Sequence, residues 1–310
     1  MVIVAVLVLA AAAAAHMAPF PFLFEAFRPS GSLWHVKQAP GTPPRVYLTF
    51  DDGPNPRWTP PLLDALRDTG VRATFFLIDE HITNETAPIV RRIAAEGHAI
   101  GLHSGTRRLM VISPAALAER LHRAAARIET ITGRAPCRLF RPHAGWRSAT
   151  MYSGLNKAGY RLAGWSWGMW DWDWWRTPRA DRVSSRLARK ASAGDIIVIH
   201  DGHHEHLRAD RRHAGETIRR LAPSLRSRGF EFGTLCESGD YGVRFDHLPF
   251  RADEPIVVGL ANDPTAPPRA TASWSIRPRR TRAGWRRLPG TPQSETRTRS
   301  TSRHQPSAHV

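Results

Sequence analysis

Short apolar runs of strand type alternate with amphipathic stretches of helical period between residues 46 and 234. The strand-type runs are 46–50, 73–78, 99–102, 138–141, 161–166, 195–200 and 230–234. The helical stretches are 60–67, 87–95, 114–131, 150–158, 181–190 and 211–226. Such alternation is typical of a parallel sheet covered by helices. We therefore predict an α/β fold, a distorted (β/α) barrel of about seven parallel strands.

The two ends of the chain differ from this alternating region. Residues 1–15 are uninterrupted apolar sequence and the first charged residue is Glu25, so residues 1–40 are interpreted as a signal peptide or membrane anchor with a linker. Residues 41–238 form the expected globular domain. Residues 239–310 are rich in Pro, Arg, Ser and Thr, which predicts a disordered basic tail. This organisation predicts an exported protein of the periplasm or cell envelope, or one anchored to the membrane.

The charge of the chain and its cysteine content bear on its binding partners and its cellular compartment. The formal net charge is +17, but residues 261–310 alone carry ten arginines against Asp263 and Glu295. The moderate excess elsewhere requires no specific nucleic-acid partner, and we expect a monomer. Cys137 and Cys236 are the only cysteines, at a spacing that matches no metal knuckle. They are interpreted as buried free thiols, or as a disulfide if the domain lies outside the cytoplasm.

Adjacent carboxylates follow the first strand-type run, in the sequence Thr-Phe-Asp-Asp-Gly-Pro of residues 49–54. The prolines that follow cannot continue a strand, so Asp51 and Asp52 are expected where a buried strand becomes a loop. Like charges this close repel, and both stay ionised only if a cation compensates one of them. A solvated turn is the alternative for an isolated Asp-Asp-Gly.

Other strand-type runs end in side chains that suit the same site, namely His103, Arg141 and His200. Imidazole is a common metal ligand, and a guanidinium compensates carboxylate charge. Tryptophans are concentrated in residues 165–175, around Asp171. They predict a sugar-stacking wall or, alternatively, an aromatic plug. The wall would be formed by Trp165, Trp170 and Trp172.

Together these motifs resemble the NodB-type polysaccharide deacetylases, a carbohydrate esterase family, over roughly residues 44–234. The matching stretches are residues 49–54, residues 138–142 with Gly145, and residues 197–200. The resemblance implies a distorted β/α barrel and hydrolysis of N-acetyl or O-acetyl groups on a polysaccharide. It also implies one divalent metal ion, zinc by preference, with cobalt, nickel or manganese as alternatives.

The resemblance also implies a role for each matching residue. Asp51 would be the general base and Arg141 would orient it. His200 would be the general acid, and Asp171 would be the carboxylate that tunes this histidine. Asp52 and His103 would be metal ligands, and Trp172 would form a wall of the acetyl pocket.

Three positions depart from the family pattern. Arg107 stands where the second motif has another histidine, and a guanidinium cannot ligate a metal. Its charge suits an anionic group of the substrate, so we assign Arg107 to substrate binding. His143 replaces a proline of the third motif and would complete the metal site or contact substrate. Gly168 replaces an aspartate of the fourth motif.

Two functions remain open from the sequence. The first is a metal-dependent hydrolase that removes acetyl groups from an acetylated polysaccharide, amide or ester. The alternative is a catalytically weakened relative that binds glycan through its tryptophans. Asp51, Arg141 and His200 together favour the enzyme, whereas the substitution at Arg107 favours the binding protein.

Overall fold

The computed structural model describes residues 2–8, 32–168, 171 and 178–236. The strands are β1 (Ser32–Leu33), β2 (Arg45–Gly53), β3 (Thr74–Ile78), β4 (Ala99–His103), β5 (Leu139–Arg141), β6 (Arg161–Ala163), β7 (Trp167–Gly168), β8 (Ile196–His200) and β9 (Glu231–Phe232). The α-helices are α3 (Thr59–Asp68), α4 (Ala87–Ala95), α5 (Pro114–Thr132), α6 (Ala149–Ala158), α7 (Ala180–Lys190) and α8 (Arg212–Arg226). Three short 3₁₀ helices complete the order: η1 (Asp79–His81), η2 (Arg107–Met110) and η3 (His143–Gly145).

The strands form one parallel sheet in the order β1-β6-β5-β4-β3-β2-β8-β7, and β9 pairs with β2. Although β6 and β7 are three residues apart in the chain, they pair with strands at opposite ends of this order. A bridge between His35 and Asp195 also joins the segment after β1 to the start of β8. The sheet is therefore curled so that its two ends approach each other.

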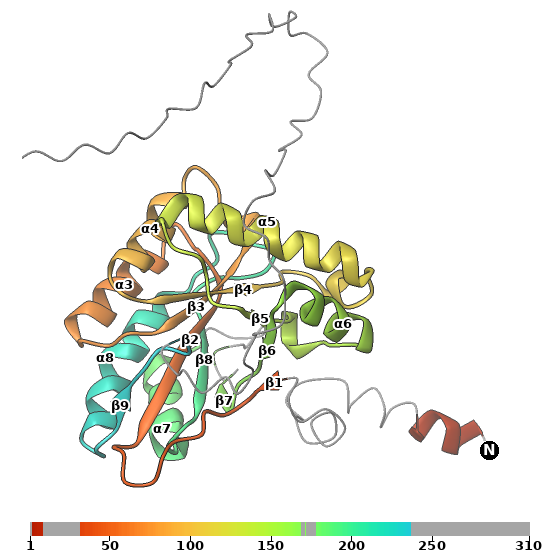
Figure 1. Cartoon of the computed structure of the whole chain (residues 1–310). Helices are drawn as coiled ribbons and strands as arrows, with labels where there is room; N and C mark the ends of the chain where they lie inside the picture. The colour runs from red at the N-terminus through yellow and green to blue at the C-terminus, as the bar shows by residue number, and fades with distance from the viewer. Residues whose placement is uncertain (1, 9–31, 169–170, 172–177, 237–310) are drawn as a thin grey trace, which may run out of the picture. The chain divides into compact units, whose positions relative to one another are not determined.

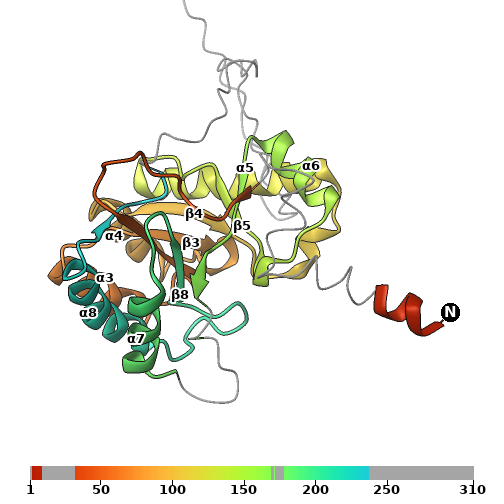
Figure 2. The same cartoon turned by 90° about the horizontal axis from the view of Figure 1, so that it is seen from below.

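Helices lie around the outside of this curled sheet, with α3, α8 and α7 on one side and α5 and α6 on the other (Figures 1 and 2). The predicted distorted (β/α) barrel is confirmed. Each of the seven predicted strands and six predicted helices has a counterpart in the structure. Strands β1 and β7 were not predicted, because these two-residue strands, unlike β9, lie outside the strand-type runs of the sequence.

Local sequence signals explain where α5 begins and ends. The Ser113 hydroxyl accepts a hydrogen bond from the Ala116 backbone N–H, and Pro114 occupies the first turn. Gly133 ends the helix in the left-handed conformation, with φ 70°. One face of the helix is buried through Leu117, Ala118, Leu121, Ala124 and Ile128. The stretch 114–131, predicted to be amphipathic, therefore packs one apolar face against the core.

The core extends N-terminal of the expected domain boundary at residue 41. The buried residues there include Leu33, Trp34 and Val36, although residues 1–40 were interpreted as a signal peptide or anchor with a linker. Gly164 makes room for this segment, because a Cβ at that position would lie 1.9 Å from the Trp34 ring. The packed part of the chain therefore includes residues 32–36. Only long-range contacts reveal this, since so short a segment carries no periodic pattern.

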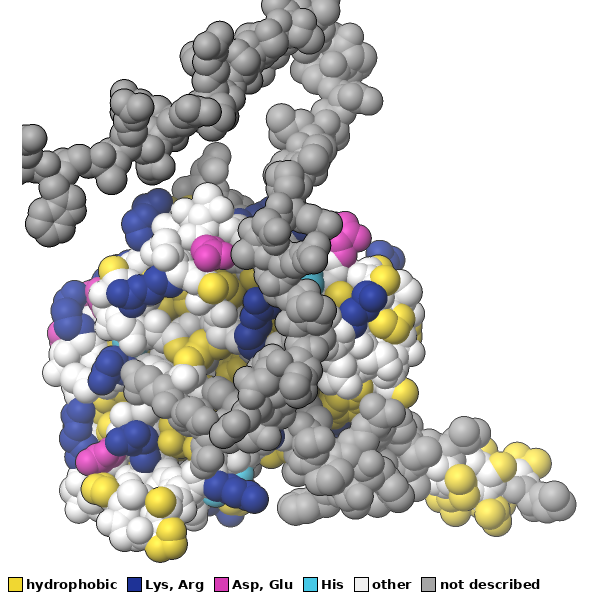
Figure 3. Space-filling model, in the orientation of Figure 1, with side chains coloured by type: hydrophobic (Ala, Val, Ile, Leu, Met, Phe, Trp, Pro, Cys, Tyr) yellow, Lys and Arg dark blue, Asp and Glu magenta, His cyan; other side chains and the backbone are white. Residues whose placement is uncertain are grey.

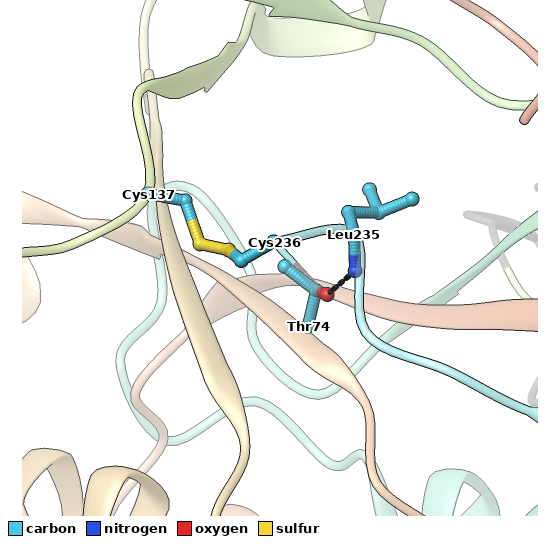
Figure 4. Close-up of a disulfide and its surroundings, with 4 residues drawn as sticks. All are labelled: Thr74, Cys137, Leu235 and Cys236. Carbon is cyan, nitrogen blue, oxygen red and sulfur yellow. Dashed lines mark hydrogen bonds between the residues drawn. A yellow bond between two sulfur atoms is a disulfide. The ribbon is translucent and has the colours of Figure 1, made fainter. Parts of the chain in front are cut away.

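A disulfide joins Cys137 and Cys236, whose Cα atoms are 6.0 Å apart (Figure 4). Of the two interpretations from the sequence, the structure has the disulfide. Next to it, the Leu235 backbone N–H donates a 3.0 Å hydrogen bond to the hydroxyl of Thr74, the first residue of β3. The disulfide and this hydrogen bond therefore attach the end of the described domain to the edge of the sheet at which the strands begin.

The exposed surface carries many basic side chains, which are spread over the face drawn in Figure 3. Residues 2–8 are helical and expose apolar side chains, with Val2 77% exposed. None of the helices in the described part has the length and apolar character that crossing a bilayer requires. The predicted basic tail, residues 239–310, lies outside the described residues.

Candidate active site

The C-terminal ends of four strands bring the predicted site residues to one pocket. Asp51 on β2 is in register with His200 on β8, and His103 on β4 is in register with Arg141 on β5. Residues in register on neighbouring parallel strands direct their side chains to the same face. The pocket lining includes Asp51, Asp52, His103, Arg107, His143, Trp165 and His200. Asp171 lies behind His200.

An irregularity in β2 turns both adjacent carboxylates toward this pocket. Successive strand residues ordinarily point to opposite faces. Here the register with β3 shifts between Asp51 and Gly53, and Asp52 has a φ of 68°. Such a bulge re-aims a side chain at the cost of backbone strain. Gly202 allows the tight packing, since a Cβ there would lie 1.9 Å from the Asp52 carbonyl oxygen.

Asp51 is held by the fully buried guanidinium of Arg141. Nη1 of Arg141 donates to Asp51 Oδ1 over 2.6 Å and to the Thr49 hydroxyl over 2.7 Å. Nη2 donates to the carbonyl of Gly164, and the guanidinium lies 4.0 Å from the centre of the Phe76 ring. These contacts fix the orientation of the Asp51 carboxylate.

Asp52 and His103 form a second buried pair. The Arg141 carbonyl can only accept a hydrogen bond, so its 2.8 Å contact with His103 Nδ1 makes Nδ1 the donor. The other nitrogen, Nε2, then faces Asp52 Oδ1 at 3.1 Å. Burial alone would raise the pKa of Asp52, but the His103 imidazole outweighs it and holds that pKa well below its usual range. Conversely, burial would lower the pKa of His103, but Asp51 and Asp52 raise it.

This pair fits two ligands of one divalent ion. The 3.1 Å between Asp52 Oδ1 and His103 Nε2 suits joint ligation, because two donors bound to a single zinc ion are themselves about 3 Å apart. In the part of the chain that the structure describes, however, no group of three His, Cys, Asp or Glu side chains is arranged to hold a metal. His143 lines the same pocket, and its role as a third ligand stays a prediction.

His200 is held by Asp171. Asp171 Oδ2 accepts a 2.6 Å hydrogen bond from the His200 backbone N–H, and Oδ1 lies 3.1 Å from His200 Nδ1. Burial opposes the charged imidazole, but Asp171, Asp52 and Asp51 outweigh it and raise the pKa of His200. The interactions with His200 also keep the pKa of Asp171 far below its usual range, against the effect of burial. His200 is thus suited to remain protonated and donate a proton.

The rim of the pocket carries Arg107 and imidazoles. The Arg107 guanidinium lies 5.3 Å from the centre of the Trp146 ring. The rings of His143 and His204 are 4.4 Å apart, and His203 stacks on His204 at 4.5 Å. Burial, together with His204, lowers the pKa of His143 to about 4, so this ring is neutral at pH 7.

The tryptophans predicted to bind sugar are only partly described. Trp165 is buried at the pocket, 5.8 Å from the guanidinium of Arg141. Trp170 and Trp172 lie outside the described residues. The sugar-stacking wall therefore stays a prediction.

Three buried polar residues near the site were not found from the sequence. Thr49 accepts from Arg141, and its place two residues before Asp51 on a buried strand could have indicated it. His213 Nε2 lies 3.4 Å from Asp171 Oδ2, a contact across the fold that no local pattern predicts. Burial, with Asp52 and Asp51 nearby, raises the pKa of Asp201 to about 7 although the Thr59 hydroxyl donates to it.

The site thus combines a carboxylate held by arginine, a carboxylate–imidazole pair and a histidine supported by a carboxylate. These are the parts of a hydrolase that works by acid–base chemistry. The comparisons with known proteins identify the family. Residues 38–163 match the profile described as polysaccharide deacetylase. A chitooligosaccharide deacetylase of Bradyrhizobium sp. (strain ANU 289) is 35% identical over 198 residues, 61% of this chain and 88% of the relative. The chain belongs to the polysaccharide deacetylase family.

Solved structures agree with this assignment. A peptidoglycan N-acetylglucosamine deacetylase, in complex with a benzamide compound, superposes with a TM-score of 0.59 at 26% identity, covering 69% of this chain and 95% of that one. A family 4 acetyl xylan esterase from Clostridium thermocellum, in complex with a cobalt ion, has a TM-score of 0.54 at 31% identity, covering 62% of this chain and 89% of that one. The resemblance inferred from the motifs is confirmed.

Proposed function

We propose that this chain removes acetyl groups from an acetylated polysaccharide with the help of one divalent metal ion. The observation that carries the proposal is the register of Asp51 with His200 across β2 and β8, with Asp52 and His103 in the same pocket. A base and an acid on neighbouring strands can act on the two sides of one scissile bond. The deacetylase relatives support this reading.

In the proposed reaction Asp51 takes a proton from the water that attacks the acetyl carbonyl carbon. Arg141 orients Asp51, since its guanidinium donates to one carboxylate oxygen and leaves the other available. His200, held protonated by Asp171, gives its proton to the leaving amine as the carbon–nitrogen bond breaks. Acetate leaves with the oxygen of the water. For an O-acetyl group the same proton goes to the leaving alcohol.

The proposed metal ligands are Asp52 and His103, with His143 as the candidate third ligand. When bound, a divalent ion would polarise the acetyl carbonyl and stabilise negative charge on its oxygen. Zinc suits a site of imidazole and carboxylate, and cobalt, nickel and manganese are alternatives. The cobalt ion bound to the acetyl xylan esterase supports a transition metal here.

We also propose that the protein acts outside the cytoplasm, as the acetylated polysaccharides of a cell envelope would require. The disulfide between Cys137 and Cys236 supports this location, because such bonds persist in oxidising compartments. The apolar stretch of residues 1–15 is consistent with export or with an anchor.

Acetate release and metal content test the proposal together. The purified protein is offered acetylated chitooligosaccharide, peptidoglycan fragments and acetylated xylan, with Asp51→Asn as the matched inactive control. We expect acetate from at least one substrate, loss of activity in chelator, and about one equivalent of bound metal. Tight glycan binding without acetate release, whatever the metal content, would instead support the weakened binding protein.

A further inference from the structure

We propose that the pocket is selective for acetylated glycans that carry a carboxylate, and that the guanidinium of Arg107 binds this carboxylate. The inference rests on the proposed deacetylase function and names its substrate class. It concerns one of the three positions at which this chain departs from the family pattern, four residues after His103.

Arg107 is placed to meet a substrate rather than to stabilise the fold. It is the first residue of η2, is exposed, and lines the same pocket as Asp52 and His103. A cation–π contact with Trp146, the residue after η3, holds the guanidinium at the rim, and this contact uses none of its N–H donors. Among the described residues, no Asp or Glu side chain forms an ion pair with Arg107.

The carboxylates around the pocket are engaged elsewhere. Asp51 accepts from Arg141, and Asp52 faces His103. Glu205, also on the lining, has a side chain that is 68% exposed and lies 3.7 Å from His204. The positive charge of Arg107 is therefore not neutralised by a neighbouring protein group within the described part.

Neighbouring imidazoles complete a site for an anion. Arg107, His143 and His204 line the same pocket, and the rings of His143 and His204 are 4.4 Å apart. An imidazole N–H can donate a hydrogen bond, and a guanidinium presents a planar fork of donors that matches a carboxylate. A carboxylate on the acetylated sugar or on the adjoining sugar would meet both kinds of donor, whereas a neutral glycan would leave the fork unpaired.

Matched substrates test the selectivity. An N-acetylated oligosaccharide with an ether-linked or ring carboxylate is compared with the same compound after reduction of the carboxylate to an alcohol. We expect the wild type to prefer the carboxylate form by about tenfold in kcat/KM, mostly through KM, and to lose preference in high salt. Arg107→Gln should bring the ratio of kcat/KM for the carboxylate compound to that for the alcohol compound near one. Arg107→Lys should keep part of the wild-type preference, and Glu205→Gln should increase the ratio.

Arg108→Gln is the control, because Arg108 is exposed and does not line the pocket. It should leave the ratio unchanged. Binding of both compounds to the wild type and to Arg107→Gln is measured by calorimetry, so the inference stays testable if no acetate is released. Equal turnover and equal binding of the two compounds by the wild type would overturn the inference while leaving the deacetylase proposal intact. Selective binding of the carboxylate compound without turnover would overturn only the deacetylase proposal.

Discussion

Arg141 Nη1 donates to Asp51 Oδ1 over 2.6 Å, and both side chains are buried, 0% and 4% exposed. A buried ion pair that loses one charge leaves the other uncompensated, which typically costs about 3–5 kcal/mol. Asp51→Asn should therefore abolish acetate release and also lower the free energy of unfolding by about 3 kcal/mol. Activity assays beside urea denaturation check both effects.

The matched control for this prediction is Asp51→Leu combined with Arg141→Met. It removes both charges, so it should recover much of the stability while remaining inactive. An Asp51→Asn variant as stable as the wild type would show that the pair does not contribute as argued.

The general acid should set the alkaline limit of activity. His200 must carry a proton, and its pKa is raised mainly because Asp171 outweighs the opposing effect of burial. Activity should therefore be lost as the pH rises through this raised pKa. Asp171→Asn removes the negative charge, so the alkaline limb of kcat/KM against pH should move to lower pH. Asp181→Asn, an exposed control paired with Arg179, should not move it; an unmoved limb in Asp171→Asn would refute the role.

His200→Ala should distinguish substrates by their leaving group. An amine leaves only after protonation, whereas an activated phenol ester needs little help. We expect a loss of roughly 100-fold or more in kcat on the amide and a much smaller loss on the ester. Parallel assays on an N-acetylated sugar and an activated acetyl ester measure this difference. Equal losses would argue against the proton-donor role.

Metal retention should depend on the pair Asp52 and His103. His103→Ala removes one of two donors 3.1 Å apart, so metal content after dialysis should fall to background. His143→Ala should weaken retention roughly 10–100-fold if His143 is the third ligand. Arg107→His should strengthen retention by adding an imidazole at the rim. His122→Ala, exposed on α5, is the control; a metal content unchanged by His103→Ala would contradict the site.

Removing the disulfide should reduce stability without removing the site. The bond closes a loop of 99 residues, for which the chain-entropy model gives about 4–5 kcal/mol at most. Cys137→Ser with Cys236→Ser should lower the urea midpoint, and reducing agent should then have no further effect. Specific activity of the folded variant should be retained at low temperature, because the bond lies at the N-terminal edge of the sheet. A wild type unaffected by reduction would argue against the bond in solution.

Much of this protein is determined by local sequence. Strand and helix periods predicted the elements of the curled sheet. The polar residues at the strand ends predicted that Asp51, His103, Arg141 and His200 are neighbours. These predictions succeed because periodicity reports which face of an element is buried, and parallel strands bring their C-terminal ends to one edge.

Only the tertiary structure decided how these residues are paired. Three features depend on contacts between distant segments. They are the bulge that turns Asp52 toward His103, the Arg141 carbonyl that selects the His103 tautomer, and the disulfide between residues 99 apart. The same is true of β1, an end strand of the sheet whose two residues are buried beside β6. Such contacts leave no period in the chain, since each is set by how separate elements pack in three dimensions.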